Sequence, residues 1–128
     1  MKQQINTTNA PAAIGPYSQA TNIGDLIFTS GQIPLCAETG EIVGDDIVSQ
    51  TGQVMNNLGA ILEAAGSDFD HVLKTTCFIT EMAHFADFNE VYSSHFTANK
   101  PARSCVAVKQ LPKAVLVEVE AIAVKIRG

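Results

Sequence analysis

The segment that decides the fold reads Pro101-Ala-Arg-Ser-Cys-Val-Ala-Val-Lys-Gln-Leu-Pro-Lys-Ala-Val-Leu-Val-Glu-Val-Glu120. It contains Arg103, one of two arginines in the chain, and it places Glu118 and Glu120 in an otherwise apolar run. Side chains alternate between the faces of a β-strand, so the two carboxylates are expected on one face. A charge beside apolar groups is costly to desolvate unless it is paired or used. The segment therefore predicts two strands joined by a turn, and we expect this hairpin to carry the active site.

The second strand of this hairpin, predicted over residues 115–125, is largely apolar on both faces. One face carries only Val and Ala, and the other carries the two glutamates among Leu116, Ile122 and Val124. A strand of this kind is normally covered on both sides. Because two helices would cover only one side of the sheet, the other side is predicted to pack against further copies of the chain in a closed, symmetric oligomer.

The rest of the chain contains strand-like and helix-like patterns in turn. β-Branched and alternating runs predict strands over 17–21, 26–32, 71–80 and 102–109, with a further short strand possible over 3–8. Apolar residues at helical spacing predict a helix from Ile47 to Ala65, which Gly66 ends, and a second helix over 82–97. The order β-β-α-β-α-β-β describes an α+β protein, one sheet with helices on one side, and we expect residues 1–128 to form one domain.

Composition narrows the classes of function. The chain has 128 residues, 46% of them hydrophobic and 16% charged, as in a compact globular protein. The net charge of −5 disfavours a nucleic-acid-binding surface. Neither a signal peptide nor an apolar run long enough to span a bilayer is present, so we expect a cytoplasmic protein with no membrane partner.

The cysteines and histidines show no metal-binding pattern. Cys36, Cys77 and Cys105 are an odd number of widely spaced thiols, which favours a reducing compartment over a disulfide framework or a zinc site. Three histidines are present without the spacing of metal ligands. We therefore expect neither a metal nor a cofactor. Cys105 is read as a packing or pocket-lining thiol rather than a nucleophile, because no histidine stands at a position to activate it.

Arg103 and Glu118 are the candidate catalytic residues. If strand 102–109 pairs with the strand that carries Glu118, the two side chains would share a face near a common ligand. A guanidinium binds a carboxylate through two parallel N–H bonds, and a carboxyl group in an apolar wall can exchange protons with water near neutral pH. The pair would suit a small carboxylic acid that reacts with water. The alternative is a purely structural Arg–Glu ion pair.

Ser30-Gly31 is a second candidate element. A glycine within a strand pattern indicates a bulge or a close approach of another group to the backbone, a ligand included. An ordinary strand end with a turn-forming glycine is the alternative.

Three segments of the chain closely resemble the RidA/YjgF family of reactive-intermediate deaminases. They are Ala-Pro-Ala-Ala-Ile-Gly-Pro-Tyr-Ser-Gln (10–19), Thr-Ser-Gly-Gln-Ile-Pro (29–34), and Pro-Ala-Arg-Ser-Cys-Val (101–106) with the downstream Leu-Val-Glu-Val-Glu (116–120). The likeness runs almost from end to end. It implies a chorismate-mutase-like α+β fold with one mixed sheet, and a homotrimer whose sheets form a central barrel with three sites in the clefts between subunits.

The resemblance also implies an activity and a role for each site residue. Family members hydrolyse 2-imino (enamine) acids, released by pyridoxal-phosphate enzymes, to 2-keto acids and ammonia. Arg103 would bind the substrate carboxylate, and Glu118 would position and activate water with help from the backbone of Cys105. Glu120 would support Glu118. The pocket would be lined by Tyr17, Ser30, Gly31 and Asn89, some of them from the neighbouring subunit.

A different class of function stays open at this point. The same clefts would serve a non-catalytic trimer that binds keto acids or a protein partner. Related proteins are also linked to ribonuclease-like inhibition of translation, but the acidic composition makes RNA the weakest of these options.

Overall fold

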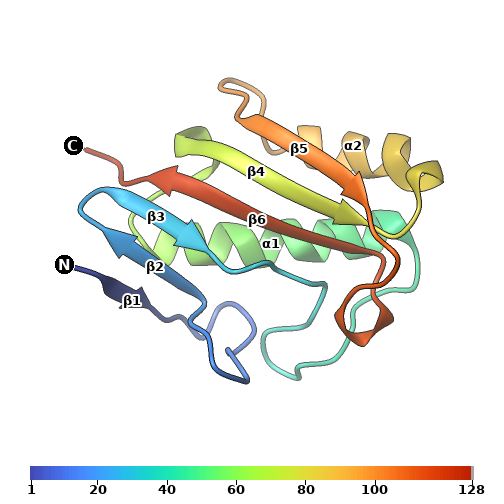
Figure 1. The fold of residues 1–128 in the computed structure, drawn as a ribbon, viewed down its shortest axis with the longest axis horizontal. Coiled ribbons are helices and arrows are strands. Elements are labelled where there is room, and N and C mark those ends of the chain that lie inside the picture. Colours follow the sequence, from blue (N-terminus) through green and yellow to red (C-terminus); the bar gives the residue numbers. More distant parts are fainter. Residues whose placement is uncertain (128) are drawn as a thin grey trace.

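The computed structural model describes residues 1–127, which form one six-stranded sheet and two α-helices (Figure 1). The strand order across the sheet is β1-β2-β3-β6-β4-β5, and only β4 and β5 run parallel to each other. The sheet is therefore mixed, and the predicted α+β class is confirmed. The strands are β1 (Gln3–Ile5), β2 (Ala20–Ile23), β3 (Leu26–Thr29), β4 (Val72–Ile79), β5 (Ala102–Ala107) and β6 (Val117–Val124).

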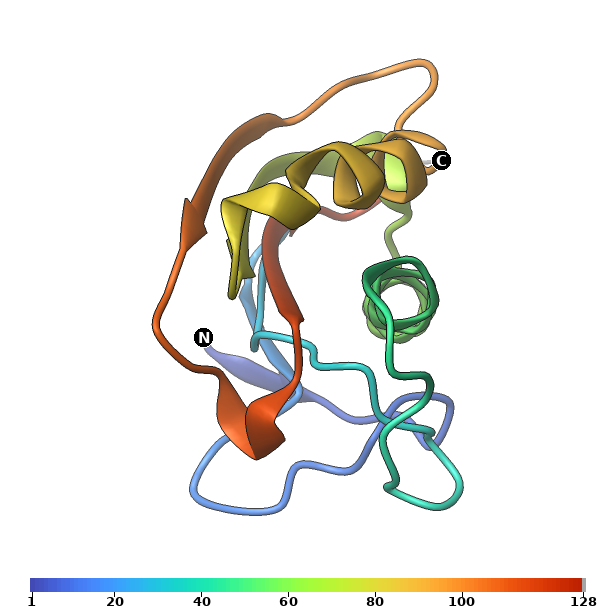
Figure 2. The same ribbon diagram turned by 90° about the vertical axis from the view of Figure 1, so that its right-hand side faces the viewer.

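Both helices lie on the same face of the sheet (Figure 2), as predicted. α1 (Ile47–Ala64) begins after Asp46, whose carboxylate accepts a hydrogen bond from the Ser49 amide at 2.8 Å, as an N-cap residue does. α2 (Phe85–Ser93) is shorter than the helix predicted over 82–97, because residues 82–84 form a 3-10 turn and the helix ends at Ser93. Further 3-10 turns lie at Phe69–His71 and Pro112–Ala114.

The hydrophobic core fills the space between the helices and one face of the sheet. Val54, Leu58 and Leu62 of α1 are fully buried there, opposite Val117 and Val119 of β6. Burial along β6 alternates strictly, with Val117, Val119, Ala121 and Ala123 buried and the residues between them half-buried. The alternation read from the sequence is thus confirmed, and Glu118 and Glu120 share the face away from the helices.

The predicted hairpin of the last two strands is wrong. β4 lies between β5 and β6 and pairs with both, in parallel with β5 and antiparallel with β6. The connection 108–116 passes the C-terminal end of β4, where the Val108 amide donates to the carbonyl of Ile79 and the Thr80 amide donates to the carbonyl of Leu116. A connection of this length spans the separation of ~10 Å between strands that have one strand between them.

Two smaller corrections concern the N-terminal region. The short strand that was possible over 3–8 is present as β1, which pairs with β2 at the sheet edge, so three strands precede α1 and the order is β-β-β-α-β-α-β-β. The strand expected over 17–21 begins only at Ala20, which leaves Tyr17 in the loop before it.

The sheet face opposite the helices carries large apolar side chains. Phe28 and Leu26 of β3 are 42% and 39% exposed, and Val106 of β5 is 45% exposed. Phe28 is in register with Ile122, and Val106 with Phe78, so these residues belong to one surface. No helix within residues 1–127 is long and apolar enough to cross a membrane.

Candidate active site

Arg103 lies on the edge strand β5 and points toward the helix side of the sheet. It is in register with Thr75 of β4, which is fully buried on that side. The guanidinium centre lies 4.9 Å from the ring centroid of Tyr92 and 5.4 Å from that of Phe85, both on α2. Its Nη1 donates a hydrogen bond of 2.5 Å to Oδ1 of Asn89. The guanidinium is thus held by one helix and still exposed.

A hollow of about 500 Å³ lies beside this guanidinium. Within residues 1–127, Arg103 forms no ion pair with a carboxylate. A guanidinium has five N–H donors in a planar fork, and Asn89 accepts from only one of its nitrogens here. The remaining donors are available to a carboxylate ligand. The hollow is lined by Ala86, Asn89, Glu90, Tyr92, Ser93, Phe96, Lys100, Pro101 and Arg103.

Glu118 lies on the other face of the sheet. It is in register with Phe78 of β4 and is half-buried. Burial, followed by the negative charge of Glu120, raises the pKa of Glu118 above the ordinary carboxyl value. A carboxyl group with a raised pKa can accept and return a proton nearer to neutral pH, as a general base does.

Gly31, which has no side chain, leaves the space that the Glu118 carboxylate occupies. A Cβ atom on Gly31 would lie 2.0 Å from Oε2 of Glu118 and 2.8 Å from its Cδ, so no larger residue fits with Glu118 in its present position. The neighbouring Gln32 pairs with Val119 through two backbone hydrogen bonds of 2.8 and 3.1 Å, which hold this segment against β6. The close backbone approach expected at Gly31 is therefore that of the Glu118 side chain.

A second hollow, of about 850 Å³, gathers most of the other candidates. Tyr17, Ser30, Gly31, Glu118 and Glu120 all line it. Ser30 is fixed to the preceding loop, because its hydroxyl donates to the carbonyl of Ser18 at 2.6 Å and its amide donates to the carbonyl of Gln19 at 2.9 Å. Its remaining walls contain apolar loop residues, among them Pro11, Ile14 and Leu35, and polar residues such as Glu38 and Lys113.

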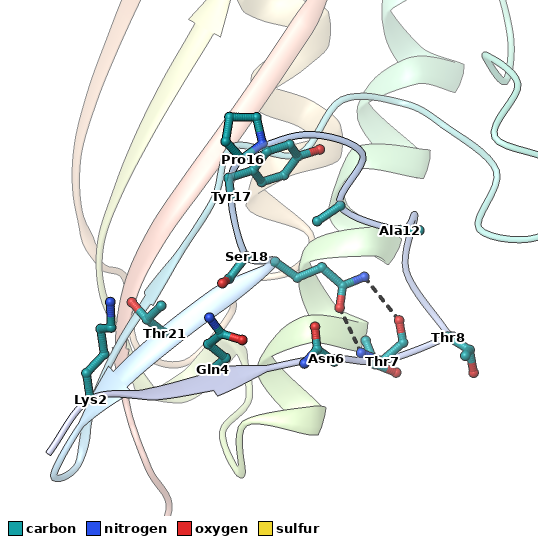
Figure 3. Close-up of a pocket in the computed structure, with 12 residues that line it drawn as sticks. Lys2, Gln4, Asn6, Thr7, Thr8, Ala12, Pro16, Tyr17, Ser18 and Thr21 are labelled. Atoms are coloured by element: carbon teal, nitrogen blue, oxygen red, sulfur yellow. Dashed lines mark hydrogen bonds between the residues drawn. The ribbon is translucent and has the colours of Figure 1, made fainter.

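Tyr17 also borders a third, mostly polar hollow next to β1 and β2 (Figure 3). Gln19, which is 3% exposed, fixes this region by bonding to the backbone of Thr7 and to the carbonyls of Ala10 and Pro11. The dashed lines in Figure 3 mark the bonds to Thr7, at 2.7 and 3.0 Å. Gln19 therefore ties the N-terminal segment to the loop that carries Tyr17.

Cys105 is half-buried beside Arg103 and in register with the fully buried Cys77. Burial raises the pKa of the Cys105 thiol, and Arg103 opposes this only in part. The thiol is thus no better ionised than an ordinary cysteine, which disfavours a nucleophilic role. No cluster of metal-ligating side chains occurs among the residues that the structure describes.

One chain separates the candidate residues into two groups. Arg103, Asn89 and Cys105 lie together on the helix side, whereas Glu118, Glu120, Tyr17, Ser30 and Gly31 lie together around the other hollow. The expectation that Arg103 and Glu118 share a face of one sheet is wrong, and residues 1–127 of one chain contain no ion pair between them. Parallel pairing of β5 with β4 places Arg103 level with Thr75 on the buried face, and this register is not visible in either strand alone.

Sequence reasoning missed two supports of the site. Phe85 and Tyr92 were not among the expected site residues, yet both contact the guanidinium. Their spacing from Asn89 places all three side chains on one helix face, and this pattern could have indicated that they contact a charged group together. Gln32, which holds the Gly31 segment against β6, has no such signal.

The whole chain is similar to proteins of known family. The family model described as "Endoribonuclease L-PSP" matches residues 7–125. The putative regulator AldR of Lactococcus lactis is 56% identical over 119 residues, covering 93% of this chain and 94% of that protein. The 2-iminobutanoate/2-iminopropanoate deaminase of Escherichia coli is 48% identical over 128 residues, covering 98% and 99% of the two chains.

Solved structures show the same fold. A putative endoribonuclease of Thermotoga maritima superimposes with a TM-score of 0.95 at 53% identity and covers 99% of this chain and 100% of its own. The structure of E. coli TdcF with bound serine has a TM-score of 0.92 at 47% identity and covers 97% of this chain and 99% of its own. Since both the family model and these relatives match nearly the full length, the chain belongs to the RidA/YjgF family, which includes imine deaminases.

Proposed function

We propose that this protein hydrolyses small 2-imino acids to 2-keto acids and ammonia, as a 2-iminobutanoate/2-iminopropanoate deaminase of the cytoplasm. The observation that carries the proposal is that one chain presents both an exposed guanidinium and a proton-accepting carboxyl group. An exposed guanidinium that has no carboxylate partner within residues 1–127 faces one hollow, and a carboxyl group with a raised pKa lines another. The E. coli relative named for this activity supports the same choice.

The chemistry needs orientation, one water molecule and a path for protons. Arg103 would bind the substrate carboxylate, which fixes the position of the adjacent C=N carbon. The substrate would react as the protonated imine. Ionised Glu118 would take a proton from water as the oxygen bonds to that carbon, while the C=N π electrons move to nitrogen and give a neutral carbinolamine. Glu118 would return this proton to the nitrogen and then accept the hydroxyl proton as the C–N bond breaks, so that ammonia leaves, the keto group forms and the last proton passes to solvent.

The proposal requires more than one copy of the chain. Arg103 and Glu118 lie on opposite faces of one sheet, so a single chain cannot present both to one small molecule. The apolar sheet face around Phe28, Val106 and Ile122 would be covered in a homotrimer, and the Arg103 hollow of one subunit would meet the Glu118 hollow of its neighbour. The site would then exist only at the junction of two subunits.

A coupled assay tests the activity. Threonine dehydratase supplies 2-iminobutanoate, semicarbazide competes for the imine, and the appearance of 2-ketobutanoate is followed. The wild-type protein should speed release of the keto acid, and Arg103→Ala should lower the rate by ~10- to 100-fold because a charge-assisted bond is lost. Arg127→Ala is the matched control, since Arg127 is the only other arginine and pairs with Asp25 at the surface.

A non-catalytic binding protein is the second candidate, and the relative named a putative regulator favours it. It predicts that keto acids bind, as measured by calorimetry, with no acceleration of imine hydrolysis. Equal rates of keto-acid release with and without the wild-type protein would rule out the deaminase, and equal accelerated rates of the wild-type and Arg103→Ala proteins would rule out the role of Arg103.

A further inference from the structure

The guanidinium of Arg103 rests on a surface that α2 provides. Phe85, Asn89 and Tyr92 stand at positions i, i+4 and i+7 of this helix and therefore lie along one of its faces. All three contact Arg103, two through their rings and one through a hydrogen bond. β5 is an edge strand, so its pairing with β4 fixes the Arg103 backbone from one side only. The end of the long side chain is fixed by the helix.

Tyr92 differs from the other two contacts because it is itself fixed from beneath. It is 6% exposed, and its hydroxyl shares a hydrogen bond of 2.6 Å with Oγ1 of Thr75, which is fully buried on β4. Burial raises the pKa of the Tyr92 hydroxyl, so the group stays neutral and the hydrogen bond persists over the working pH range. Thr75 is also the register partner of Arg103. Thr75 therefore holds Tyr92 by a hydrogen bond, and Tyr92 and Asn89 in turn hold the guanidinium of Arg103.

We propose that Tyr92, fixed by Thr75, is a positioning residue that holds the Arg103 guanidinium flat and pre-oriented for the carboxylate of the substrate. The ring attracts the cation through its π face and leaves the N–H groups at the guanidinium edge free for a planar, bidentate partner. Phe85 contributes a second ring to the same end. An arginine already held in this way loses less conformational freedom when a carboxylate binds, so Tyr92 should increase the affinity for the substrate more than the rate of the chemical step. This inference rests on the proposed function only in naming the ligand that Arg103 receives.

Substitutions at Tyr92 and its neighbours separate this role from simple packing. Tyr92→Phe keeps the ring and should change KM for 2-iminobutanoate by less than about threefold, whereas Tyr92→Leu should raise KM about tenfold with a smaller change in kcat. Thr75→Val, which removes the hydroxyl that bonds to Tyr92 and accepts a weak bond from the Cys77 thiol, should lie between these two. Phe88→Leu is the matched packing control. Phe88 is a fully buried aromatic residue of the same helix whose ring packs against Tyr92 at a centroid distance of 5.4 Å, and no cation–π contact joins it to Arg103 within residues 1–127.

A measurement without substrate keeps the inference independent of the deaminase assignment. The protons on Cδ and Nε of Arg103 should show upfield ring-current shifts by nuclear magnetic resonance, and these should be lost in Tyr92→Leu and retained in Tyr92→Phe and Phe88→Leu. If Tyr92→Leu does not fold, Phe85→Leu and Thr75→Val give the same comparison. Unchanged Arg103 shifts together with unchanged binding of 2-ketobutanoate in these variants would overturn the positioning role. Failure of the wild-type protein to bind 2-ketobutanoate or to hydrolyse imines would instead overturn the proposed function. The Arg103 proton shifts alone would then decide whether Tyr92 positions the guanidinium.

Discussion

At the scale of single residues, Gly31 has the tightest steric constraint of the site. Gly31→Ala would place a methyl group where the Glu118 carboxylate lies, with a Cβ–Oε2 separation of 2.0 Å. The carboxylate would have to move by more than an ångström, and displacements of this size cost up to ~100-fold in rate. We expect kcat/KM for 2-iminobutanoate to fall about 10- to 100-fold while the protein still folds, as measured in the coupled assay and by thermal unfolding.

Gly52→Ala is the control for this substitution. Gly52 lies within α1, and a Cβ atom there would meet no neighbouring atom of residues 1–127 within 4 Å. Alanine in a helix interior is more favourable than glycine by ~0.5–1 kcal/mol, so this variant should be slightly more stable and fully active. Equal activities of the Gly31→Ala and Gly52→Ala variants would show that the position of Glu118 is unimportant.

The pKa of Glu118 predicts a shift in the pH profile. Burial raises this pKa, and the charge of Glu120 raises it further. A general base must be ionised to act, so activity should fall as pH decreases through the raised pKa of Glu118. Glu120→Gln removes one of the two causes, which lowers the pKa of Glu118 and should move the acidic limb of kcat/KM to lower pH.

Glu38→Gln is the comparison for this pH shift. Glu38 lines the same hollow but does not contribute to the pKa of Glu118. The pH profile of kcat/KM for the Glu38→Gln variant should match that of the wild type. An acidic limb that stays in place in Glu120→Gln would argue against Glu118 as the group that titrates.

At the scale of secondary-structure elements, α1 is fixed by the residues that face the sheet. Leu58 is fully buried, whereas Val48 on the same helix is 50% exposed. Leu58→Ala should lower the free energy of unfolding by ~2–5 kcal/mol, because it removes buried methyl groups and leaves a cavity. Val48→Ala should change it by less than ~0.5 kcal/mol. Urea unfolding measures both, and similar losses in the two variants would contradict the burial pattern.

The elements themselves were largely predictable from local patterns. The apolar spacing from Ile47 onward and the alternation along β6 each reflect one buried face, and both are confirmed. The pairing of strands was less accessible, because it depends on contacts between distant segments. Adjacent strands in a sequence usually pair, which favours a hairpin for β5 and β6, yet β4 is inserted between them.

This pairing also limited the prediction of the site. Alternation placed Glu118 and Glu120 together correctly, but it could not relate the faces of two different strands. Arg103 was assigned to the face of Glu118, and the parallel register with Thr75 places it on the other face. The role of Gly31 was predicted only in part. Its sequence pattern indicated that another group lies close to its backbone, but it did not identify that group as the Glu118 side chain.

At the scale of the whole molecule, the exposed apolar face and the divided site point to the same arrangement. Phe28 and Val106 lie on the face that also carries Glu118, and contiguous apolar surfaces of this kind mark sites of association. Covering that face with another copy would bury the apolar side chains and bring a second set of candidate residues to the subunit junction. The assembly would then stabilise the fold and complete the site in a single step.

Mixing two inactive variants tests this arrangement directly. If Arg103 of one subunit and Glu118 of its neighbour form each site, Arg103→Ala and Glu118→Ala chains that are refolded together in equal amounts should regain about a quarter of the wild-type activity, because one junction in four pairs the two intact residues. If both residues came from one chain, every site would lack one of them and no activity would return. A mixture of Arg103→Ala with wild-type chains should give about half of the wild-type activity in either case, whether or not subunits exchange, so it serves as the reference for activity lost during refolding.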